Sequence, residues 1–292
     1  MASIKKKKIG NKVYYYLTQT IRKGSKFYIR ERYLGKELPK DIDKIKKEFL
    51  YEIYKEKYFE SLEAIQKEFL KQRSLSPKSS REKELGNFMI RFTYNTQRIE
   101  GSKLTLKETH NLLEGNITPK SKKLDDIKEA EAHKKVFYDM LGYNKDLSLQ
   151  VVLYWHKSLF ESTKKDITGK IRTHQVTISG SKFIPPFPAE IYTLLREFFT
   201  WYDNNKKKLN PVELACLVHL RFVSIHPFAD GNGRISRLMM NFVLEKNNYP
   251  MFDIKYENRV GYYNTLERSQ ISKNDSFFLQ WFFRNYIKEY KR

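Results

Sequence analysis

The pattern of apolar and polar residues changes its period along the chain. Residues 12–22 and 26–34 are rich in β-branched and aromatic side chains, and a Lys-Gly-Ser segment at 23–25 separates them, which predicts a β-hairpin. Between residues 42 and 69 the apolar positions instead recur three and four apart among charged ones. That spacing is typical of one long amphipathic helix or of two in succession. The polar segment 74–80, which contains Pro77, predicts a boundary or linker after these helices.

The helical period then continues almost to the end of the chain. It predicts helices over residues 84–97, 105–113, 125–140, 148–161, 188–204, 211–223, 234–246, 258–269 and 276–290. Thr105 and Glu108 have the spacing of a capping box at the start of the second of these. Residues 172–186 are the exception, because two short apolar runs flank Ser-Gly-Ser and predict a second small hairpin. We therefore expect a mainly α protein with an N-terminal hairpin and helical extension over residues 1–78 and a helical domain over 79–292.

The composition of the chain suggests one candidate partner, nucleic acid, and argues against a membrane. The formal net charge is +22, and the first 40 residues hold twelve Lys or Arg against two acidic residues. This asymmetry makes the N-terminal segment a candidate for contact with nucleic acid, although lysine-rich surfaces also occur for solubility alone. The single cysteine, Cys216, excludes a disulfide within the chain. No apolar window reaches the length of a membrane span and no signal peptide is evident, so we expect a cytoplasmic protein in a reducing compartment.

Residues 226–237, His-Pro-Phe-Ala-Asp-Gly-Asn-Gly-Arg-Ile-Ser-Arg, lie between two predicted helices and should form a loop that leads into a helix N-terminus. Unpaired N–H groups at a helix start favour anions, and Gly231 and Gly233 let a phosphate approach the main chain. Arg234 and Arg237 lie three apart and can both grip phosphate oxygens. The segment therefore predicts a phosphate site.

Two further side chains in this segment suit the chemistry of phosphate esters. Asp230 offers the carboxylate oxygen that a Mg²⁺ ion bridging two phosphates prefers. His226 is the neighbouring group whose pKa suits removal of a proton near neutral pH. The combination of base, acid, glycines and arginines is much harder to explain as a structural turn than any one of these residues alone.

This segment resembles the Fic-family motif His-Pro-Phe-x-(Asp/Glu)-Gly-Asn-Gly-Arg-x-x-Arg at every defined position. The stretch from Gly169-Lys-Ile-Arg to Pro185-Pro186 is similar to the family's flap, a hairpin across the active site. The resemblance covers about residues 81–288 and implies a Fic catalytic domain over 79–292, whereas residues 1–78 have no assignment. It implies a protein adenylyltransferase that uses ATP and Mg²⁺ to attach AMP to Ser, Thr or Tyr hydroxyls.

The resemblance also implies a role for each residue of the site. His226 would be the base, Asp230 would hold Mg²⁺, and Asn232 would join Gly231, Gly233, Arg234 and Arg237 around the phosphates. Tyr262 and Tyr263 match a tyrosine pair beside the adenine, although Tyr near a helix start is also ordinary core material. Val176, Thr177 and Ile178 on the flap would pair with an extended target segment.

A second resemblance lies at the end of the helix predicted over about 84–100. Thr96, Glu100 and Gly101 match the inhibitory motif (Ser/Thr)-x-x-x-Glu-(Gly/Asn), and the implied partner of Glu100 is Arg237. Such a pair would occupy the arginine that the γ-phosphate of ATP needs, so the enzyme would be auto-inhibited. In relatives of this arrangement the same glutamate can also assist removal of AMP.

Two alternative functions remain open on the sequence. One is a Fic-like transferase that uses another nucleotide donor, although both arginines favour a triphosphate. The other is a nucleic-acid-binding protein that acts through its basic N-terminal segment. The target protein is unidentified, with the enzyme itself as one candidate, and the resemblance implies a homodimer.

Overall fold

The computed structural model describes residues 2–23 and 26–291, which form two compact units divided between Ala64 and Ile65. This division falls inside helix α2 (Glu60–Leu75), earlier than the domain boundary expected after residue 78. The expected boundary coincides instead with a break between helices, where Pro77 occupies the N-cap position of α3 (Lys78–Ile99). Most of the turn predicted at 23–25 lies outside the described residues.

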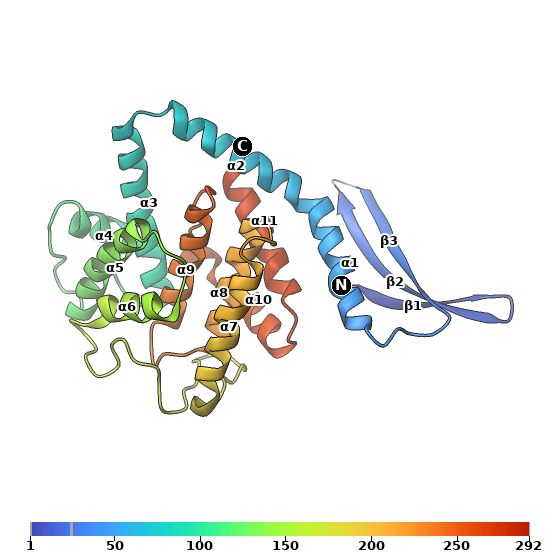
Figure 1. The fold of residues 1–292 in the computed structure, drawn as a ribbon. Coiled ribbons are helices and arrows are strands. Elements are labelled where there is room, and N and C mark those ends of the chain that lie inside the picture. The colour runs from blue at the N-terminus through green and yellow to red at the C-terminus, as the bar shows by residue number, and fades with distance from the viewer. Residues whose placement is uncertain (1, 24–25, 292) are drawn as a thin grey trace. The chain divides into compact units, whose positions relative to one another are not determined.

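The N-terminal unit contains an antiparallel sheet with strand order β1-β2-β3 (Figure 1). Strands β2 (Lys12–Lys23) and β3 (Lys26–Gly35) correspond to the two runs predicted as a hairpin. Strand β1 (Ser3–Ile9) was not predicted, because four consecutive lysines have low strand propensity by themselves. It forms by pairing along β2, with Ile4 opposite Leu17.

A small core joins this sheet to helix α1 (Ile42–Tyr54). Leu17 and Ile21 of β2 are buried against Phe49 and Ile53 of the helix. The long amphipathic pattern is realised as α1, a π-helical turn η1 (Lys55–Phe59) and α2 in direct succession. The region is thus one continuous helical run, as the first alternative predicted. A π-helical turn divides it into two α-helices, as the second predicted.

The C-terminal unit is helical, which confirms the mainly α fold. Thr105 caps α4 with Glu108 in the predicted capping box. None of the helices among the described residues is long and apolar enough to cross a membrane. The remaining elements are α4 (Leu106–Leu113), α5 (Leu124–Gly142), α6 (Leu149–Phe160), η2 (Pro188–Glu190), α7 (Ile191–Asn205), α8 (Pro211–Ile225), α9 (Asn232–Lys246), η3 (Tyr256–Asn258), α10 (Arg259–Ile271) and α11 (Ser276–Tyr290).

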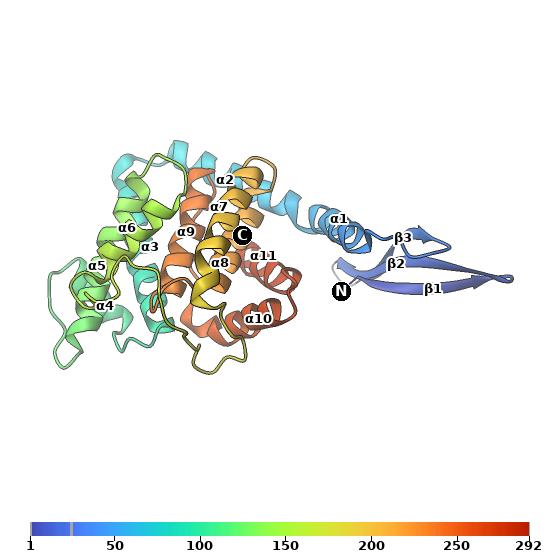
Figure 2. The ribbon, with the colours of Figure 1, turned by 60° about the horizontal axis from the view of Figure 1, so that its bottom comes forward.

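Helices α8 and α9 form the centre of this unit and run side by side in Figures 1 and 2. Both are buried on nearly all sides, since α8 also contacts α7 and α11 while α9 contacts α3, α5 and α6. A helix enclosed in this way must be apolar around its circumference or must pair its polar groups. The segment between these two helices is therefore held by the best-packed part of the domain.

The hairpin predicted at 172–186 is wrong in its pairing. No strand occurs between α6 and α7, and residues 170–187 form an irregular loop with a turn in which Ser181 N donates to the carbonyl of Ile178. The backbone groups of Val176 and Thr177 form no hydrogen bond with other backbone groups in the described chain. Side chains therefore hold this loop, called the flap below, in place of strand pairing.

Candidate active site

The loop that follows α8 is set by two residues with left-handed backbone conformation. His226 ends α8 with φ 52°, and Gly231 begins α9 with φ 81°. Histidine adopts this conformation at a cost that the surrounding structure must offset. A side chain at Gly231 would overlap the ring of Phe160, so the glycine is needed for both backbone conformation and space.

Asn232 and His156 fix the shape of this loop. The Asn232 side chain accepts a hydrogen bond from Phe228 N (2.9 Å) and donates one to Phe228 O (2.8 Å), closing the loop on itself. The ring of His156 stacks on Phe228 with centroids 3.8 Å apart. Its Nε2 donates to the carbonyl of Asp230 (3.1 Å), and its Nδ1 accepts from Gly169 N (2.9 Å). His156 thereby links the loop to the start of the flap.

The hydrogen bonds of His226 suit a general base. Its Nδ1 lies 3.3 Å from the carbonyl of Val223 and can only donate to that oxygen, which leaves Nε2 free to accept a proton. Burial lowers the pKa of His226, and nearby Arg172 lowers it further, against the opposing effect of the Val223 carbonyl. The imidazole is therefore neutral near pH 7, the form that a base requires.

Asp230 lies in a network of charges of which two, Glu129 and Arg234, are buried. Its Oδ2 accepts from Lys164 Nζ at 2.6 Å and its Oδ1 from Arg234 Nη2 at 3.3 Å. Glu129, which is 6% exposed, pairs with both Lys164 and Arg234. Burial opposes ionisation of Asp230, but Arg234 and Lys164 outweigh it, so the pKa of Asp230 is lowered. The carboxylate of Asp230 is thus ionised and is surrounded by the positive charges of Arg234 and Lys164.

The donor set around Asp230 fits Mg²⁺ held jointly with a substrate. No cluster of three or more His, Cys, Asp or Glu side chains able to hold a metal occurs among the described residues. Mg²⁺ is commonly bound by one or two carboxylates together with phosphate oxygens and water, in contrast to all-protein cages. A single ionised carboxylate at a helix N-terminus is what such a shared site needs from the protein.

Arg237 is buried and forms hydrogen bonds with three residues. It is 1% exposed, and its Nε donates to Thr96 Oγ1 at 2.7 Å. Its Nη2 donates to Glu100 Oε1 at 2.5 Å and its Nη1 to the hydroxyl of Tyr262 at 3.3 Å. The structure therefore brings Thr96 and Glu100 together with Arg237, which lies 137 positions after Glu100, as the inhibitory motif implied.

The Glu100 carboxylate also lies at the start of α9. A Cβ atom placed on Gly233 would collide with Glu100 Oε1, so the carboxylate approaches the main chain where Gly233 has no side chain. The N-terminus of a helix attracts anions through its unpaired N–H groups. Glu100 therefore lies where the sequence predicted a phosphate.

The two tyrosines have different surroundings. Tyr262 is 1% exposed, and its hydroxyl lies 3.0 Å from Nε2 of the buried His219 as well as near Arg237. Burial lowers the pKa of His219, so this ring is neutral and Nε2 can accept from the tyrosine. Tyr263 is 43% exposed and donates to the carbonyl of Ile99 at 2.8 Å. Tyr262 thus supports Arg237, whereas Tyr263 is the accessible member of the pair, and their contact with adenine stays a prediction.

The flap is tied at its base and near its tip. Arg172, 4% exposed, donates to the carbonyls of His226 (2.8 Å), His174 (2.9 Å) and Pro186 (2.6 Å). It therefore joins both arms of the flap to the catalytic loop. Near the tip, Ser181 Oγ donates to Glu267 of α10 at 2.8 Å. The predicted target segment 176–178 lies between these two attachments.

Four residues of this site escaped the sequence analysis as functional candidates: Glu129, His156, Lys164 and Arg172. Only Arg172 had a signal, because it ends the segment that resembles the start of the flap. The others lie on α5, on α6 and just after α6, and reach the site only through the packing of those helices. A single sequence contains no periodicity that marks them.

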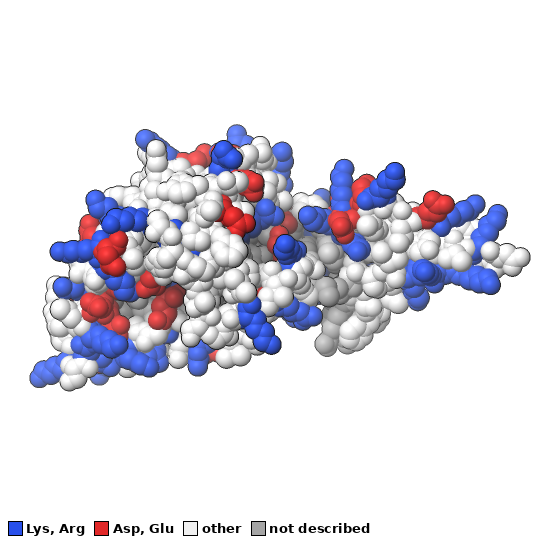
Figure 3. Space-filling view, turned by 90° about the horizontal axis from the view of Figure 1, so that it is seen from below, with Lys and Arg blue, Asp and Glu red and all other residues white. Residues whose placement is uncertain are grey.

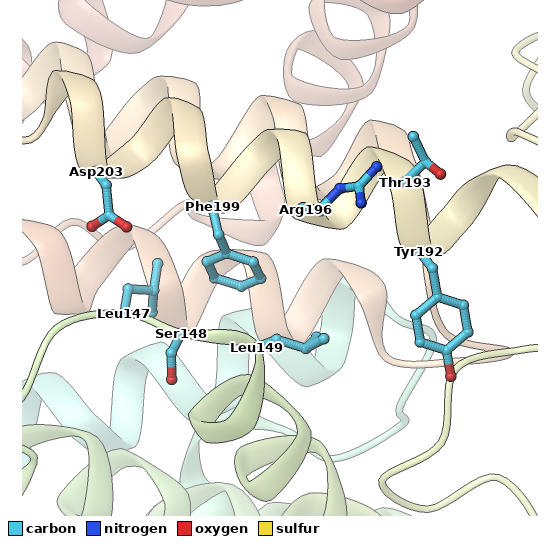
Figure 4. A pocket seen from close by; sticks show the side chains of 8 residues that line it. All are labelled: Leu147, Ser148, Leu149, Tyr192, Thr193, Arg196, Phe199 and Asp203. Atoms are coloured by element: carbon cyan, nitrogen blue, oxygen red, sulfur yellow. The ribbon is translucent and has the colours of Figure 1, made fainter.

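A separate surface pocket lies beside the start of α6. Figure 4 shows side chains of α7 facing the segment that leads into α6. The pocket has a volume of about 530 Å³. None of the predicted site residues lines it. The pocket is lined by Leu147, Ser148, Leu149, Tyr192, Thr193, Arg196, Phe199 and Asp203.

Comparison with known proteins agrees with this geometry. Residues 146–244 match the Fic/DOC family. The chain is 31% identical over 183 residues to the protein adenylyltransferase Fic of Aedes aegypti, which covers 61% of this chain and 36% of that protein. The Drosophila melanogaster protein of the same name is 33% identical over 178 residues, covering 60% and 36%. The chain thus spans about a third of the length of these curated relatives.

Solved structures extend the likeness in fold beyond the matched segment. A Fic-domain-containing signalling protein from Bacteroides thetaiotaomicron has a TM-score of 0.72 and 25% identity, covering 79% of this chain and 95% of that one. Fic-1 from C. elegans has a TM-score of 0.73 and 22% identity, covering 83% and 72%. The fold is a helical domain in which a catalytic-loop candidate leads into the start of the buried helix α9. The likeness to the Fic/DOC family is thus carried by the sequence of residues 146–244 and by the fold of a larger part of the chain.

Proposed function

We propose that this chain is an auto-inhibited protein adenylyltransferase, which transfers AMP from ATP to a hydroxyl group of a protein side chain. The observation that carries the proposal is the convergence of His226, Asp230 and Arg237 on the start of α9, with Glu100 held against Arg237. Similarity to the curated adenylyltransferases supports the same reaction.

The residues divide the reaction between them. Nε2 of His226 takes the proton of the target hydroxyl, whose oxygen forms a bond to the α-phosphorus while the bond to the β-phosphate oxygen breaks and pyrophosphate leaves. The start of α9 and the two arginines neutralise charge on the phosphates, which supplies the electrostatic stabilisation. Bound through Asp230, Mg²⁺ supplies additional positive charge to the phosphate oxygens. Lys164 pairs with Asp230, and Glu129 pairs with both Lys164 and Arg234, so these charges are balanced within the protein.

Auto-inhibition follows from the position of Glu100. Its carboxylate accepts a hydrogen bond from the guanidinium of Arg237 and fills the space beside Gly233. The phosphates of ATP would need both the guanidinium and this space. An anion at this point repels ATP phosphates and removes the donor that aligns them. The side chain of Glu100 is 27% exposed, so it can leave without unfolding the domain.

The flap presents the target. The backbone N–H and C=O groups of Val176 and Thr177 pair with no other backbone group of the described chain, so they are free to pair with an extended peptide. Main-chain hydrogen bonds depend little on the side chains of the peptide, so the enzyme should have only a weak preference for the sequence of its target. A flexible segment of the enzyme itself is one such target.

Transfer of label from ATP tests the proposal. Wild type, Glu100→Gly and Glu100→Gly/His226→Ala are incubated with Mg²⁺ and ATP labelled at the α-phosphate, and label on protein is measured. We expect strong label with Glu100→Gly, faint label with wild type and none with the double variant. Parallel reactions with α-labelled GTP, CTP and UTP identify the donor.

Glu114→Gly is the matched control. Glu114 also ends a helix and precedes a glycine, but it lies at the end of α4. Its replacement should leave labelling at the wild-type level. Equal labelling of Glu100→Gly and wild type would remove auto-inhibition from the proposal, and retained labelling in the double variant would remove His226 as the base.

A further inference from the structure

We propose that the sheet of the N-terminal unit binds single-stranded nucleic acid on the face opposite α1. This inference is independent of AMP transfer, since it concerns residues 3–35 alone. The surface, called the open face below, is defined by the side chains of Lys5, Lys12, Tyr14, Tyr16, Phe27 and Tyr33.

The strand register separates the two faces of the sheet. Leu17 and Ile21 of β2 are buried against α1, so the even-numbered residues of β2 point to the other side. Lys5 is opposite Tyr16 on β1, and Tyr33 is opposite Tyr16 on β3. These cross-strand partners share one face, and no helix of the N-terminal unit covers it.

Charge is distributed unequally between these two faces. On the side of α1, Arg30 pairs with Glu56 at 3.0 Å and Arg32 with Glu52 at 2.6 Å, so helix carboxylates neutralise the strand arginines. On the open face, Glu31 is the only acidic residue of the three strands and is paired with Lys7 at 2.6 Å.

The other strand lysines keep their charge available. Lys5 and Lys12 of the open face are exposed and form no ion pair among the described residues. Lys and Arg side chains fringe this unit in Figure 3, with few acidic ones among them. The open face therefore attracts a polyanion, because no acidic side chain of the three strands neutralises Lys5 and Lys12.

Aromatic rings lie between these lysines. Tyr33 is 53% exposed and Phe27 67% exposed. The centroid of the Tyr33 ring lies 5.3 Å from that of Tyr16 and 6.2 Å from that of Tyr14, so the three form a contiguous aromatic patch. Lys7 lies over Tyr16 at 4.5 Å.

This combination selects the class of polyanion. Exposed rings on a sheet stack on the faces of unpaired bases, while neighbouring lysines contact the phosphates. In a duplex the base faces are already stacked on one another, so the aromatic patch would contribute little. A folded acidic protein would likewise leave the rings without flat partners. The open face therefore suits a single strand.

Fluorescence anisotropy with the full chain tests the proposal. A labelled 20-nucleotide oligo(dT), the same length of oligo(U) and a duplex of equal length are titrated at several salt concentrations. We expect both single strands to bind, with affinity falling about tenfold or more between about 50 and 200 mM salt, and the duplex to bind more weakly.

Two pairs of variants separate phosphate contact from stacking. Lys5→Ala/Lys12→Ala should weaken binding and reduce the slope of log affinity against log salt by about 1.4, the effect of two lost phosphate contacts. Its control, Lys44→Ala/Lys47→Ala, removes two exposed lysines of α1 and should have a much smaller effect. Tyr33→Ser should weaken binding about fivefold or more at an unchanged slope. Its control is Tyr192→Ser, which alters an exposed tyrosine of α7.

Several results would overturn the proposal. These are absence of salt-sensitive binding to either single strand, duplex affinity equal to or above that of the single strands, and equal weakening by the α1 control. Loss of binding together with loss of the circular dichroism spectrum in Tyr33→Ser would leave the lysine pair as the deciding variant. The labelling reaction described above should be unaffected by all four variants.

Discussion

Lys164 Nζ lies 2.6 Å from Asp230 Oδ2 and 3.0 Å from Glu129 Oε1, so one lysine neutralises both the proposed Mg²⁺ ligand and the buried acid behind it. Lys164 is 33% exposed and its pKa is raised, because its bonds to Asp230 and Glu129 outweigh the effect of burial. A metal bound at Asp230 would compete with this ammonium group for the same carboxylate.

Replacement of Lys164 by methionine should therefore alter metal affinity. We expect Lys164→Met to lower several-fold the Mn²⁺ concentration that half-saturates the complex with a non-hydrolysable ATP analogue, measured by water-proton relaxation. Lys165→Met, which changes the exposed neighbour, is the matched control. Weaker Mn²⁺ binding in Lys164→Met than in the control would contradict competition. It would show that the lysine helps to position Asp230.

Two buried histidines should make the fold sensitive to acid. Burial lowers the pKa of His133 to about 3 and that of His156 to about 4. In the unfolded chain these histidines take up protons near pH 6.5, whereas in the folded chain they stay neutral. The free energy of unfolding is therefore highest above pH 6.5 and falls as the pH decreases toward 4. Each histidine should cost about 1 kcal/mol at pH 5.5.

Urea unfolding at pH 7.5 and 5.5 measures this cost. His156→Gln should be less stable than wild type at pH 7.5, because it loses the bonds to Asp230 and Gly169, but its stability should decrease less between the two pH values. His110→Gln, at an exposed position of α4, should retain the full wild-type decrease. An unchanged pH dependence in His156→Gln would mean that this ring titrates alike in both states.

The pH profile of AMP transfer should reflect the lowered pKa of His226. Burial and Arg172 lower that pKa, and Glu100 opposes the change, so its removal in Glu100→Gly should lower the pKa further. We expect kcat/KM of Glu100→Gly to stay on its plateau at pH 7 and to fall only below pH 6.5. An acid limb centred above pH 7 would be incompatible with His226 as a neutral base.

Arg172 should control the order of the flap. Its guanidinium donates to three carbonyls, and lysine cannot reach all three. We expect Arg172→Lys to destabilise the domain by about 2 kcal/mol, the order expected for buried carbonyls left without a donor. Hydrogen–deuterium exchange across 173–186 should accelerate, whereas Arg196→Lys on the exposed face of α7 should leave it unchanged. Unaltered exchange in Arg172→Lys would assign the order of the flap to the Glu267 contact alone.

Much of the helical fold could be predicted from the sequence, because helices such as α4 carry both their period and their capping residues locally. The three-stranded sheet was predicted only in part. The pairing of β1 depends on apolar residues of β2, and lysines give no sign of it. The flap was assigned strands on local composition, but its order comes from Arg172 and Glu267, whose side-chain contacts composition does not encode.

The candidate site divides in the same way. Residues 226–237 are contiguous and lead into a helix start, so candidate roles could be assigned to them from spacing and chemistry, and these roles stay predictions. The pairing of Glu100 with Arg237 required a resemblance, because 137 positions separate them. Glu129 and Lys164 had neither signal. They act through buried charge, which depends on how α5 and α6 pack.

The attachments of the flap have a consequence for the energetics of target binding. A loop fixed at its base by Arg172 and near its tip by Ser181 has already lost most of its conformational freedom when the domain folds. A docking peptide then has to order only itself, so a short segment with few side-chain contacts can still bind long enough to react. Under the proposed function, the rigidity of the flap would account for both broad selectivity and adequate affinity.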